Sequence, residues 1–399
     1  MSSPRVLFYV QHLLGIGHIK RASLLVRGWL EAGLQVSVVS GGEAVEQFGF
    51  DGAELIQLPP VRACDASFSA LVDQQGQPLS EGFKQQRREQ LLQTLERVKP
   101  DLLVIENYPF GRRQLRWELK PLLIRAGALE KPPIRICSVR DILQRRKPER
   151  EQESLDLLAA HFDAVMVHGD PAFIPLHDSF PRSTELADKL HYTGYVTELQ
   201  DSSRHKDGGG SNEVLVSAGG GAVGFSLMKA CLEALRLPEQ AQALSANGEP
   251  VCWRLLLGPN MTEQQTEQLQ ALARAADPDR YRVIMEPLRP DFVDLLKACR
   301  LSISQGGYNT LMDLLSARPR AVVVPFEGSG ETEQRARTER LAELGLCQWV
   351  SEAQLGPEAI CAAIINALNA PAGNPFQLDC NGAAKSASIL QQLYETPDK

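Results

Sequence analysis

The sequence predicts two α/β domains, each built on a parallel β-sheet with helices on both faces. The chain has 399 residues, which exceeds one ordinary hydrophobic core and suits two domains of roughly 150–200 residues. Short apolar runs alternate with stretches of helical periodicity, which is typical of parallel sheets. This alternation stops at one polar, glycine-rich segment and then starts again, which predicts a second domain of the same class.

Apolar runs, each followed by a helical pattern such as that of residues 83–98, predict the strands of the first domain. These strands are expected at residues 6–10, 35–39, 102–105, 134–138 and 164–167.

The segment "DSSRHKDGGGSN" has the composition of a linker. After it, strands are expected at residues 214–217, 253–257, 281–284, 301–303 and 321–324, and an amphipathic stretch at 382–394. We therefore expect an N-terminal domain over residues 1–200, a linker over 201–212, a second domain over 213–375 and a C-terminal helix within 376–399.

The composition excludes several classes of protein. A net charge of −7 argues against a general nucleic-acid binder. No apolar run approaches the roughly 18–20 residues of a membrane span, and the first residues enter a strand instead of a signal peptide. The eight cysteines are scattered and none has CxxC spacing, so we expect reduced thiols, no zinc site and a cytoplasmic protein.

The first strand ends in a turn with two glycines, and His18 follows them at the start of a helix. The turn matches neither a P-loop nor a dinucleotide fingerprint, because Lys20 stands where the latter needs a small residue. Gly17 lets the backbone approach a ligand closely, and the helix N-terminus adds a positive dipole end. The alternative is a plain connection with a surface histidine.

Two loops of the second domain have the composition of anion sites. Gly219, Gly220 and Gly221 lie between a strand and a helix, where consecutive N–H groups form an anion nest; a flexible turn is the alternative. The second loop is "QGGYNTLMD", which starts at Gln305 and runs to Asp313.

In this second loop, Gln305, Gly306 and Gly307 turn the chain into a helix. Asn309 and Thr310 lie in the first helical turn, beside unpaired N–H groups, and complete a cradle for a diphosphate. Asp313 follows on the same face, where a carboxylate accepts two hydrogen bonds from the diol of a ribose. This order of groups predicts a nucleotide-sugar site; a solvated helix carboxylate is the alternative for Asp313.

The same loop resembles the signature His-Cys-Gly-Trp-Asn-Ser-Thr-Leu-Glu of plant glycosyltransferases. The chain as a whole resembles the GT-B glycosyltransferases, in particular the branch with the lipid-II-forming GlcNAc transferase and the UDP-glycosyltransferases. Thr193-Gly194-Tyr195-Val196 resembles the domain-closing Thr-Gly-x-Pro of that family without its proline. The sequence also departs from the family at Gln305, which replaces histidine, and at Tyr308, which replaces tryptophan.

This resemblance implies two Rossmann-like domains that face each other across a cleft, with the C-terminal helix packed back on the N-terminal domain. It assigns the phosphates to Asn309 and Thr310, the ribose to Asp313, and the donor sugar to Glu333 and Gln334. It favours a UDP-sugar as co-substrate, with no other cofactor; thymidine and guanosine diphosphates remain alternatives.

In the family, a histidine in the first loop deprotonates the acceptor hydroxyl, and His18 matches it. Glu106, at the end of a neighbouring strand, is expected to orient His18. The alternatives are that Glu106 acts alone as the base, or that it is only a capping carboxylate. Direct attack inverts the anomeric configuration, and helix dipoles stabilise the leaving diphosphate without a metal. The string from Asp277 to Asp279 lies on the wrong side of the sheet for a metal site.

The acceptor is expected at the loops of the N-terminal domain, including the long segment 61–83. Arg112, Arg140 and Asp141 are candidate contacts for it. Further arginines stand at positions 113, 145 and 146. Such a basic face suits an anionic or lipid-linked acceptor, or a peripheral contact with the inner face of a membrane; the alternative is a solvated surface.

Two other classes of function remain open. One is a nucleotide-sugar 2-epimerase or hydrolase of the same fold. The other is a catalytically inactive nucleotide-sugar-binding protein, because a fold by itself does not determine an activity.

Overall fold

The computed structural model describes most of the chain, in two compact units. The described residues are 3–13, 17–44, 49–64, 70–197, 212–218, 224–238, 250–258, 261–276, 278–328, 332–371 and 377–396. The first unit consists of Met1–Gln200 together with Leu378–Lys399, and the second of Asp201–Gln377. Residues 201–211 of the expected linker lie outside the described residues.

The first unit contains, within its described residues, a seven-stranded sheet in the order β3-β2-β1-β6-β7-β8-β9. All neighbouring strands of this sheet pair in parallel. The chain builds outward from β1 in one direction and from β6 in the other, so the strand order reverses between β1 and β6. The strands are β1 (Arg5–Val10), β2 (Gln35–Ser40), β3 (Glu54–Gln57), β6 (Leu102–Glu106), β7 (Ile134–Arg140), β8 (Ala164–His168) and β9 (Leu190–Tyr192).

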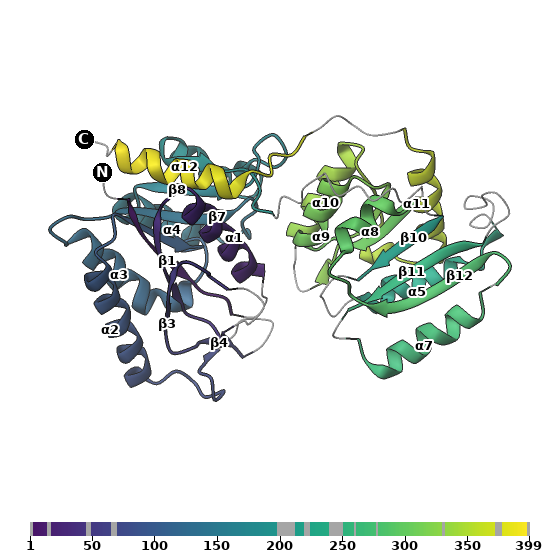
Figure 1. The fold of residues 1–399 in the computed structure, drawn as a ribbon, viewed down its shortest axis with the longest axis horizontal. Coiled ribbons are helices and arrows are strands. Elements are labelled where there is room, and N and C mark those ends of the chain that lie inside the picture. The colour runs from purple at the N-terminus through teal and green to yellow at the C-terminus, as the bar shows by residue number, and fades with distance from the viewer. Residues whose placement is uncertain are drawn as a thin grey trace. The chain divides into compact units, whose positions relative to one another are not determined.

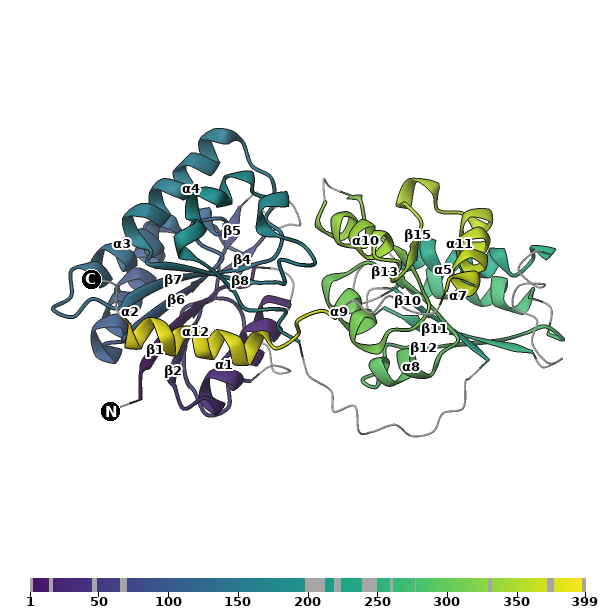
Figure 2. The same ribbon diagram turned by 90° about the horizontal axis from the view of Figure 1, so that it is seen from above.

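Helices cover both faces of this sheet (Figures 1 and 2). Successive residues of β1 point to opposite faces: Leu7 and Tyr9 join one hydrophobic core, and Phe8 and Val10 join the other. The first core packs against α2 (Glu81–Val98), α3 (Arg116–Gly127) and α4 (Pro148–His161), and the second against α1 (Gly17–Glu31) and α12 (Gly382–Glu395).

The C-terminal helix α12 lies beside α1, as Figures 1 and 2 show, and this confirms the predicted packing on the N-terminal domain. The Trp29 indole donates a hydrogen bond to Ser386 Oγ (2.8 Å). Gly28 allows the close approach, because a Cβ there would lie 2.9 Å from that of Ala383. The segment before α12 is held by Tyr195, whose N–H bonds the Asp379 carbonyl (2.7 Å).

The second unit repeats this topology. Its described residues contain a six-stranded parallel sheet in the order β12-β11-β10-β13-β14-β15, with the reversal between β10 and β13. The strands are β10 (Glu213–Ser217), β11 (Val251–Leu257), β12 (Tyr281–Pro287), β13 (Leu301–Gln305), β14 (Ala321–Val324) and β15 (Gln348–Trp349). The helices are α5 (Gly224–Ala234), α7 (Glu263–Arg274), α8 (Phe292–Ala298), α9 (Tyr308–Ala317), α10 (Glu333–Glu343) and α11 (Pro357–Asn369).

Short elements complete the two units. The long segment before α2 contains a small hairpin of β4 (Arg62–Ala63) and β5 (Leu71–Val72). A 3-10 turn, η1 (Arg113–Leu115), leads into α3, and two more, η2 (Leu176–Asp178) and η3 (Pro181–Lys189), precede β9. Among the helices in the described part of the chain, none is long and apolar enough to cross a membrane. All eight cysteines are free thiols.

Candidate active site

The reversal of strand order marks a candidate site in each unit. Loops that follow the two central strands of such a sheet leave in opposite directions, and the crevice between them is where open α/β sheets bind ligands. In the first unit these loops follow β1 and β6. In the second unit they follow β10 and β13.

In the first unit, His18 and Glu106 meet at this point. His18 lies in the first turn of α1, and Glu106 is the last residue of β6 and only 2% exposed. The distance from His18 Nδ1 to Glu106 Oε1 is 2.7 Å. Arg21 Nη2 donates to the same oxygen (2.6 Å), and Arg112 Nη2 lies 3.8 Å from the other carboxylate oxygen. The predicted pair is therefore within hydrogen-bonding distance, and two arginines lie beside the Glu106 carboxylate.

The surroundings fix the charge of each partner. Burial by itself raises the pKa of Glu106, but the groups around it outweigh burial and hold that pKa well below its ordinary value. Burial lowers the pKa of His18 to about 4, against the opposing charge of Glu106. A neutral His18 beside an ionised Glu106 donates its Nδ1–H to the carboxylate. Nε2 then carries the lone pair that accepts a proton.

Glu106 itself and two buried side chains beside the pair have polar atoms with no hydrogen-bond partner among the described residues. The atoms are Nδ1 of His12, Oε2 of Glu106, and Nε and Nη2 of Arg112. His12 follows β1 and is 6% exposed; burial and the charge of Arg112 lower its pKa. The sequence reasoning missed His12. Its position two residues after the first strand, in the same stretch as His18, is a signal that pointed to it.

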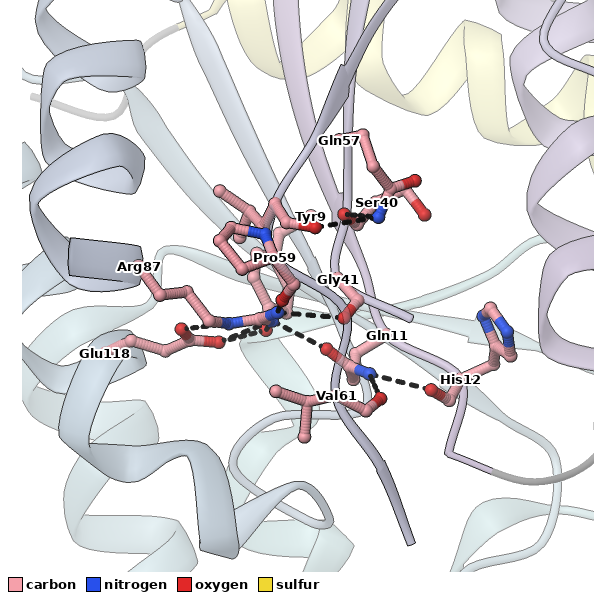
Figure 3. A network of polar contacts seen from close by, with 11 residues as sticks. Tyr9, Gln11, His12, Ser40, Gly41, Gln57, Pro59, Val61, Arg87 and Glu118 are labelled. Carbon is pink, nitrogen blue, oxygen red and sulfur yellow. Dashed lines mark hydrogen bonds and ion pairs between the residues drawn. The ribbon is translucent and has the colours of Figure 1, made fainter. Parts of the chain in front are cut away.

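A buried ionic network holds the loop that carries His12 (Figure 3). Arg87 on α2 and Glu118 on α3 are both 0% exposed and form an ion pair of 2.7 Å. Arg87 also donates to the Gly41 carbonyl (2.9 Å) and to Gln11 Oε1 (2.7 Å), and Gln11 donates to the His12 carbonyl (2.7 Å). These hydrogen bonds offset the desolvation of the buried pair, and they connect two helices to the loop after β1.

The other predicted acceptor residues differ in their burial and in the contacts that they make within the fold. Arg140 is the half-buried last residue of β7. Asp141 is fully buried, and one of its oxygens accepts a hydrogen bond from the Tyr195 hydroxyl (2.7 Å). Arg112 turns inward toward Glu106, whereas Arg113 forms an ion pair with Glu153.

His168 is a second buried histidine at this edge of the sheet, but its ring is bonded within the fold. Its Nε2 lies 2.7 Å from Ser138 Oγ, and its Nδ1 lies 3.0 Å from Thr193 Oγ1. Burial lowers its pKa to about 3. Both ring nitrogens are therefore engaged in hydrogen bonds within the fold.

In the second unit, the loop after β13 turns tightly into α9. A Cβ at Gly306 would lie 3.0 Å from Thr338 Oγ1 and 3.2 Å from a backbone atom of Pro325, so only glycine fits without a shift. Gly307 precedes the helix and no side chain caps it, so the positive end of the helix dipole lies at this loop. Gln305 is 9% exposed, and its Oε1 has no hydrogen-bond partner within the described part of the chain.

The predicted nucleotide ligands lie along this helix start: Thr310 is buried, Asn309 is exposed and Asp313 is half-buried. The glycines at positions 219–221 and the aspartate at 277 lie outside the described residues. In the part of the chain that the structure describes, no three His, Cys, Asp or Glu side chains are grouped to hold a metal ion.

The predicted donor-sugar residues are at the start of α10 and already have partners. Glu333 is buried and lies 3.4 Å from Arg337 Nη2. Gln334 Oε1 accepts a hydrogen bond from the Phe326 N–H (3.0 Å).

Residues 215–393 match the sequence model of the glycosyltransferase family 28 C-terminal domain. No curated protein has a significantly similar sequence. Among solved structures, MurG of Acinetobacter baumannii is similar over 98% of this chain and 100% of its own, with 16% identity and a TM-score of 0.61.

The calicheamicin glycosyltransferase CalG4 is similar over 99% of this chain and 95% of its own (15% identity, TM-score 0.58). A kitacinnamycin glycosyltransferase is similar over 98% and 96% (16% identity, TM-score 0.60). Identities this low show the fold, and they confirm the predicted fold class across both units.

Proposed function

We propose that this chain, a GT-B glycosyltransferase with a family 28 C-terminal domain, transfers a sugar from a nucleoside diphosphate to an acceptor hydroxyl with inversion at the anomeric carbon. UDP is the favoured donor nucleotide. The observation that carries the proposal is the 2.7 Å contact between His18 Nδ1 and Glu106. It leaves a histidine nitrogen free to accept a proton at the point where the strand order reverses.

The proton and the bonds balance in a single displacement. The acceptor oxygen forms a bond to the anomeric carbon, the bond from that carbon to the diphosphate breaks, and the acceptor proton moves to His18 Nε2. Glu106 stabilises the imidazolium that results. The lowered pKa of Glu106 favours the role of partner over that of base, because a carboxylate held ionised by arginines is a poor proton acceptor.

The donor is proposed to lie at the N-terminus of α9 in the second unit. Asn309, Thr310 and the N-terminus of α9 bind the diphosphate, and Asp313 binds the ribose. The positive end of the helix stabilises the leaving group, so we propose a reaction that needs no metal. Gln334 keeps its amide N–H groups for the donor sugar, whereas Glu333 is engaged by Arg337.

On the acceptor side we retain Arg112 and Arg140 as candidate contacts. Asp141 is less suited, because its buried carboxylate already binds Tyr195. Eight free thiols support a cytoplasmic place of action.

The test is turnover of UDP-sugars with a panel of alcohols, followed by UDP release and by NMR of the anomeric proton of the product. We expect UDP release that needs an acceptor, persists in EDTA and yields the inverted anomer. Free sugar without an acceptor identifies a hydrolase instead, and interconversion of sugars identifies an epimerase. UDP binding without turnover of any UDP-sugar identifies an inactive binding protein.

A further inference from the structure

Arg21 lies beside the proposed base, yet the displacement described above gives it no role. It follows His18 by three positions on α1, so the two side chains leave the helix on the same face. Its Nη2 donates to Glu106 Oε1 over 2.6 Å, and His18 Nδ1 lies 2.7 Å from the same oxygen. One carboxylate oxygen therefore binds a histidine and an arginine at once.

The guanidinium of Arg21 also lies close to the imidazole ring, with 3.4 Å between its Nη2 and His18 Nδ1. A contact of 2.7 Å between Nδ1 and an ionised carboxylate needs a proton on Nδ1, because two acceptors repel each other at that distance. The ring and the guanidinium thus donate to Glu106 side by side. A second proton, which would charge the ring, is opposed by the cation next to it.

The three side chains differ in their access to solvent. The side chain of Glu106 is 2% exposed and that of Arg21 is 6% exposed, whereas 21% of the His18 side chain is exposed. Charges interact more strongly where water is largely excluded. The ion pair of Arg21 with Glu106 therefore acts strongly on the ring, and only His18 keeps substantial surface for a substrate.

Without a cation, a buried carboxylate raises the pKa of a neighbouring histidine, because the pair is then most stable as carboxylate and imidazolium. An imidazolium has no lone pair and accepts no proton from a hydroxyl. In this structure burial prevails and lowers the pKa of His18 to about 4; Glu106 opposes that shift, and Arg112 and Arg21 act in its favour.

Three further ionisable groups lie near this pair. Arg112 Nη2 is 3.8 Å from the other oxygen of Glu106 and acts on the ring in the same direction as Arg21. Burial lowers the pKa of His12 and of His168, so both are neutral near pH 7 and add no charge there. Arg21 is thus the cation in contact with the carboxylate oxygen that the proposed base also contacts.

We propose that Arg21 is a positioning residue, which shares Glu106 Oε1 with His18 and thereby keeps the histidine neutral, in the form that accepts a proton. This inference rests on the proposed function for the reaction that His18 serves. The charge on His18 is measured without turnover.

The test is the pKa of His18 in the full chain, from histidine NMR resonances at a series of pH values. The signal of His18 is assigned by its loss in His18→Ala. Arg21→Gln keeps an N–H donor and removes the charge, whereas Arg21→Lys keeps the charge. We expect Arg21→Gln to raise the pKa by about 1–3 pH units, the usual effect of one charge at this distance, and Arg21→Lys to change it by less than about half a pH unit. Arg27→Gln removes an exposed charge from the same helix and is the matched control, with an unchanged pKa.

The pH profile of kcat/KM gives a second readout. In Arg21→Gln the fall of kcat/KM at low pH is expected to begin at a higher pH, in step with the pKa of His18. At pH 8, where the ring is neutral in both proteins, kcat is expected to stay within about tenfold of the wild type. A role in packing alone would lower kcat at every pH and leave the profile in place.

An unchanged His18 pKa in Arg21→Gln, or a shift as large in Arg21→Lys, would overturn the proposal. If Arg21→Gln does not fold, Glu106→Gln is compared with the double variant of both positions. Loss of the guanidinium is expected to raise the His18 pKa there too, and no change would overturn the proposal. A raised pKa in a protein that turns over no UDP-sugar contradicts the proposed function alone. Turnover with an unchanged pKa contradicts the role of Arg21 alone.

Discussion

The two units share one strand order, yet the points where that order reverses carry opposite chemistry. Between β1 and β6 the first unit gathers ionisable side chains, with a nearly fully buried carboxylate in contact with a histidine and an arginine. Between β10 and β13 the second unit offers, within its described residues, glycines, an amide and a hydroxyl at the start of a helix. The two units therefore share a strand order, but the side chains at the two crevices differ in their chemistry.

The crevice of the first unit suits proton transfer, and the crevice of the second unit suits the binding of an anion. Proton transfer needs a group whose charge changes, with a partner that stabilises the charged form. Holding a diphosphate needs fixed dipoles that do not change during the reaction. If the two crevices have these roles, substitutions in one alter turnover and substitutions in the other alter nucleotide affinity.

Removal of the proposed base is expected to have the largest effect. His18→Ala lowers kcat by about 10³–10⁴-fold and leaves UDP affinity unchanged, because general-base catalysis contributes on this order. Steady-state kinetics and UDP binding check both values. The exposed His177→Asn is the matched control and keeps full turnover. A variant at position 18 with near-normal kcat would contradict the role of His18.

Glu106→Gln is expected to lower kcat by about 10²–10³-fold, since a neutral amide stabilises the imidazolium less than a carboxylate. It also lowers the free energy of unfolding by about 3–5 kcal/mol, because buried Arg21 and Arg112 lose their counter-charge. Kinetics are therefore measured below the melting temperature of the variant. Full turnover in Glu106→Ala would remove this residue from the mechanism.

Asp313→Asn tests the second crevice. Loss of the charged acceptor for the ribose hydroxyls is expected to weaken UDP binding by about 10–100-fold, the equivalent of one to two hydrogen bonds to a charged group. Calorimetric titration with UDP measures it. Asp294→Asn, an exposed carboxylate in the first turn of α8, provides the control. Equal affinity in the two variants would assign Asp313 to the solvated surface.

The pH dependence is expected to follow mainly from His18 and His168 in the first unit, where burial lowers the pKa most. Because the pKa of His18 is lowered to about 4, kcat/KM is expected to stay flat above pH 6 and to fall up to tenfold per pH unit below about 4. The free energy of unfolding also falls at low pH, because the pKa of His18 in the folded protein lies below its unfolded value of about 6.5. The contribution of His18 to the free energy of unfolding is therefore fully present above pH 6.5 and is lost as pH falls to about 4. The contribution of His168 is lost down to about pH 3.

The slope of that loss is roughly 1.4 kcal/mol per pH unit for each histidine. Urea unfolding as a function of pH measures it, and histidine NMR resonances give the midpoint for His18. A midpoint near 6.5 would show that the ring is solvated, and it would break the contrast between the two crevices.

The smallest effect is expected at His12. Its buried Nδ1 has no partner among the described residues and faces the field of Arg112 and Glu106, so it is suited to position the acceptor. His12→Asn is expected to raise the acceptor KM up to about tenfold with little change in kcat. His191→Asn is the control, and an unchanged KM in His12→Asn would leave His12 with a packing role.

Much of the fold could be predicted from the sequence, because alternating strands and helices leave periodic patterns that do not depend on distant contacts. The short strands β3, β9 and β15 were missed, since strands of two to four residues leave little pattern. The proximity of His18 and Glu106 could be anticipated because both follow strands of one parallel sheet.

Other features of the site depend on distant contacts. The Arg87–Glu118 pair joins two helices, and no local pattern shows that both side chains are buried. The bond between Asp141 and Tyr195 spans 54 positions in the same way. The pairing of Glu333 with Arg337 was visible in principle, because residues four apart on a helix are neighbours. That spacing indicates that Arg337 engages the Glu333 carboxylate, which is then less available to the donor sugar.

The most direct test of the contrast between the crevices is the thermal stability of the wild type, His18→Ala and Asp313→Ala with UDP, dTDP, GDP and ADP. A nucleotide at about 100 times its Kd adds roughly 2.7 kcal/mol, or roughly 5–10 °C for a unit of this size. We predict that UDP alone stabilises the wild type and His18→Ala equally. It stabilises Asp313→Ala by only about 0.4–1.4 kcal/mol at the same concentration, because its affinity is about 10–100-fold lower. Equal stabilisation of all three proteins, or no stabilisation by any nucleotide, would contradict the assignment of nucleotide binding to the second crevice.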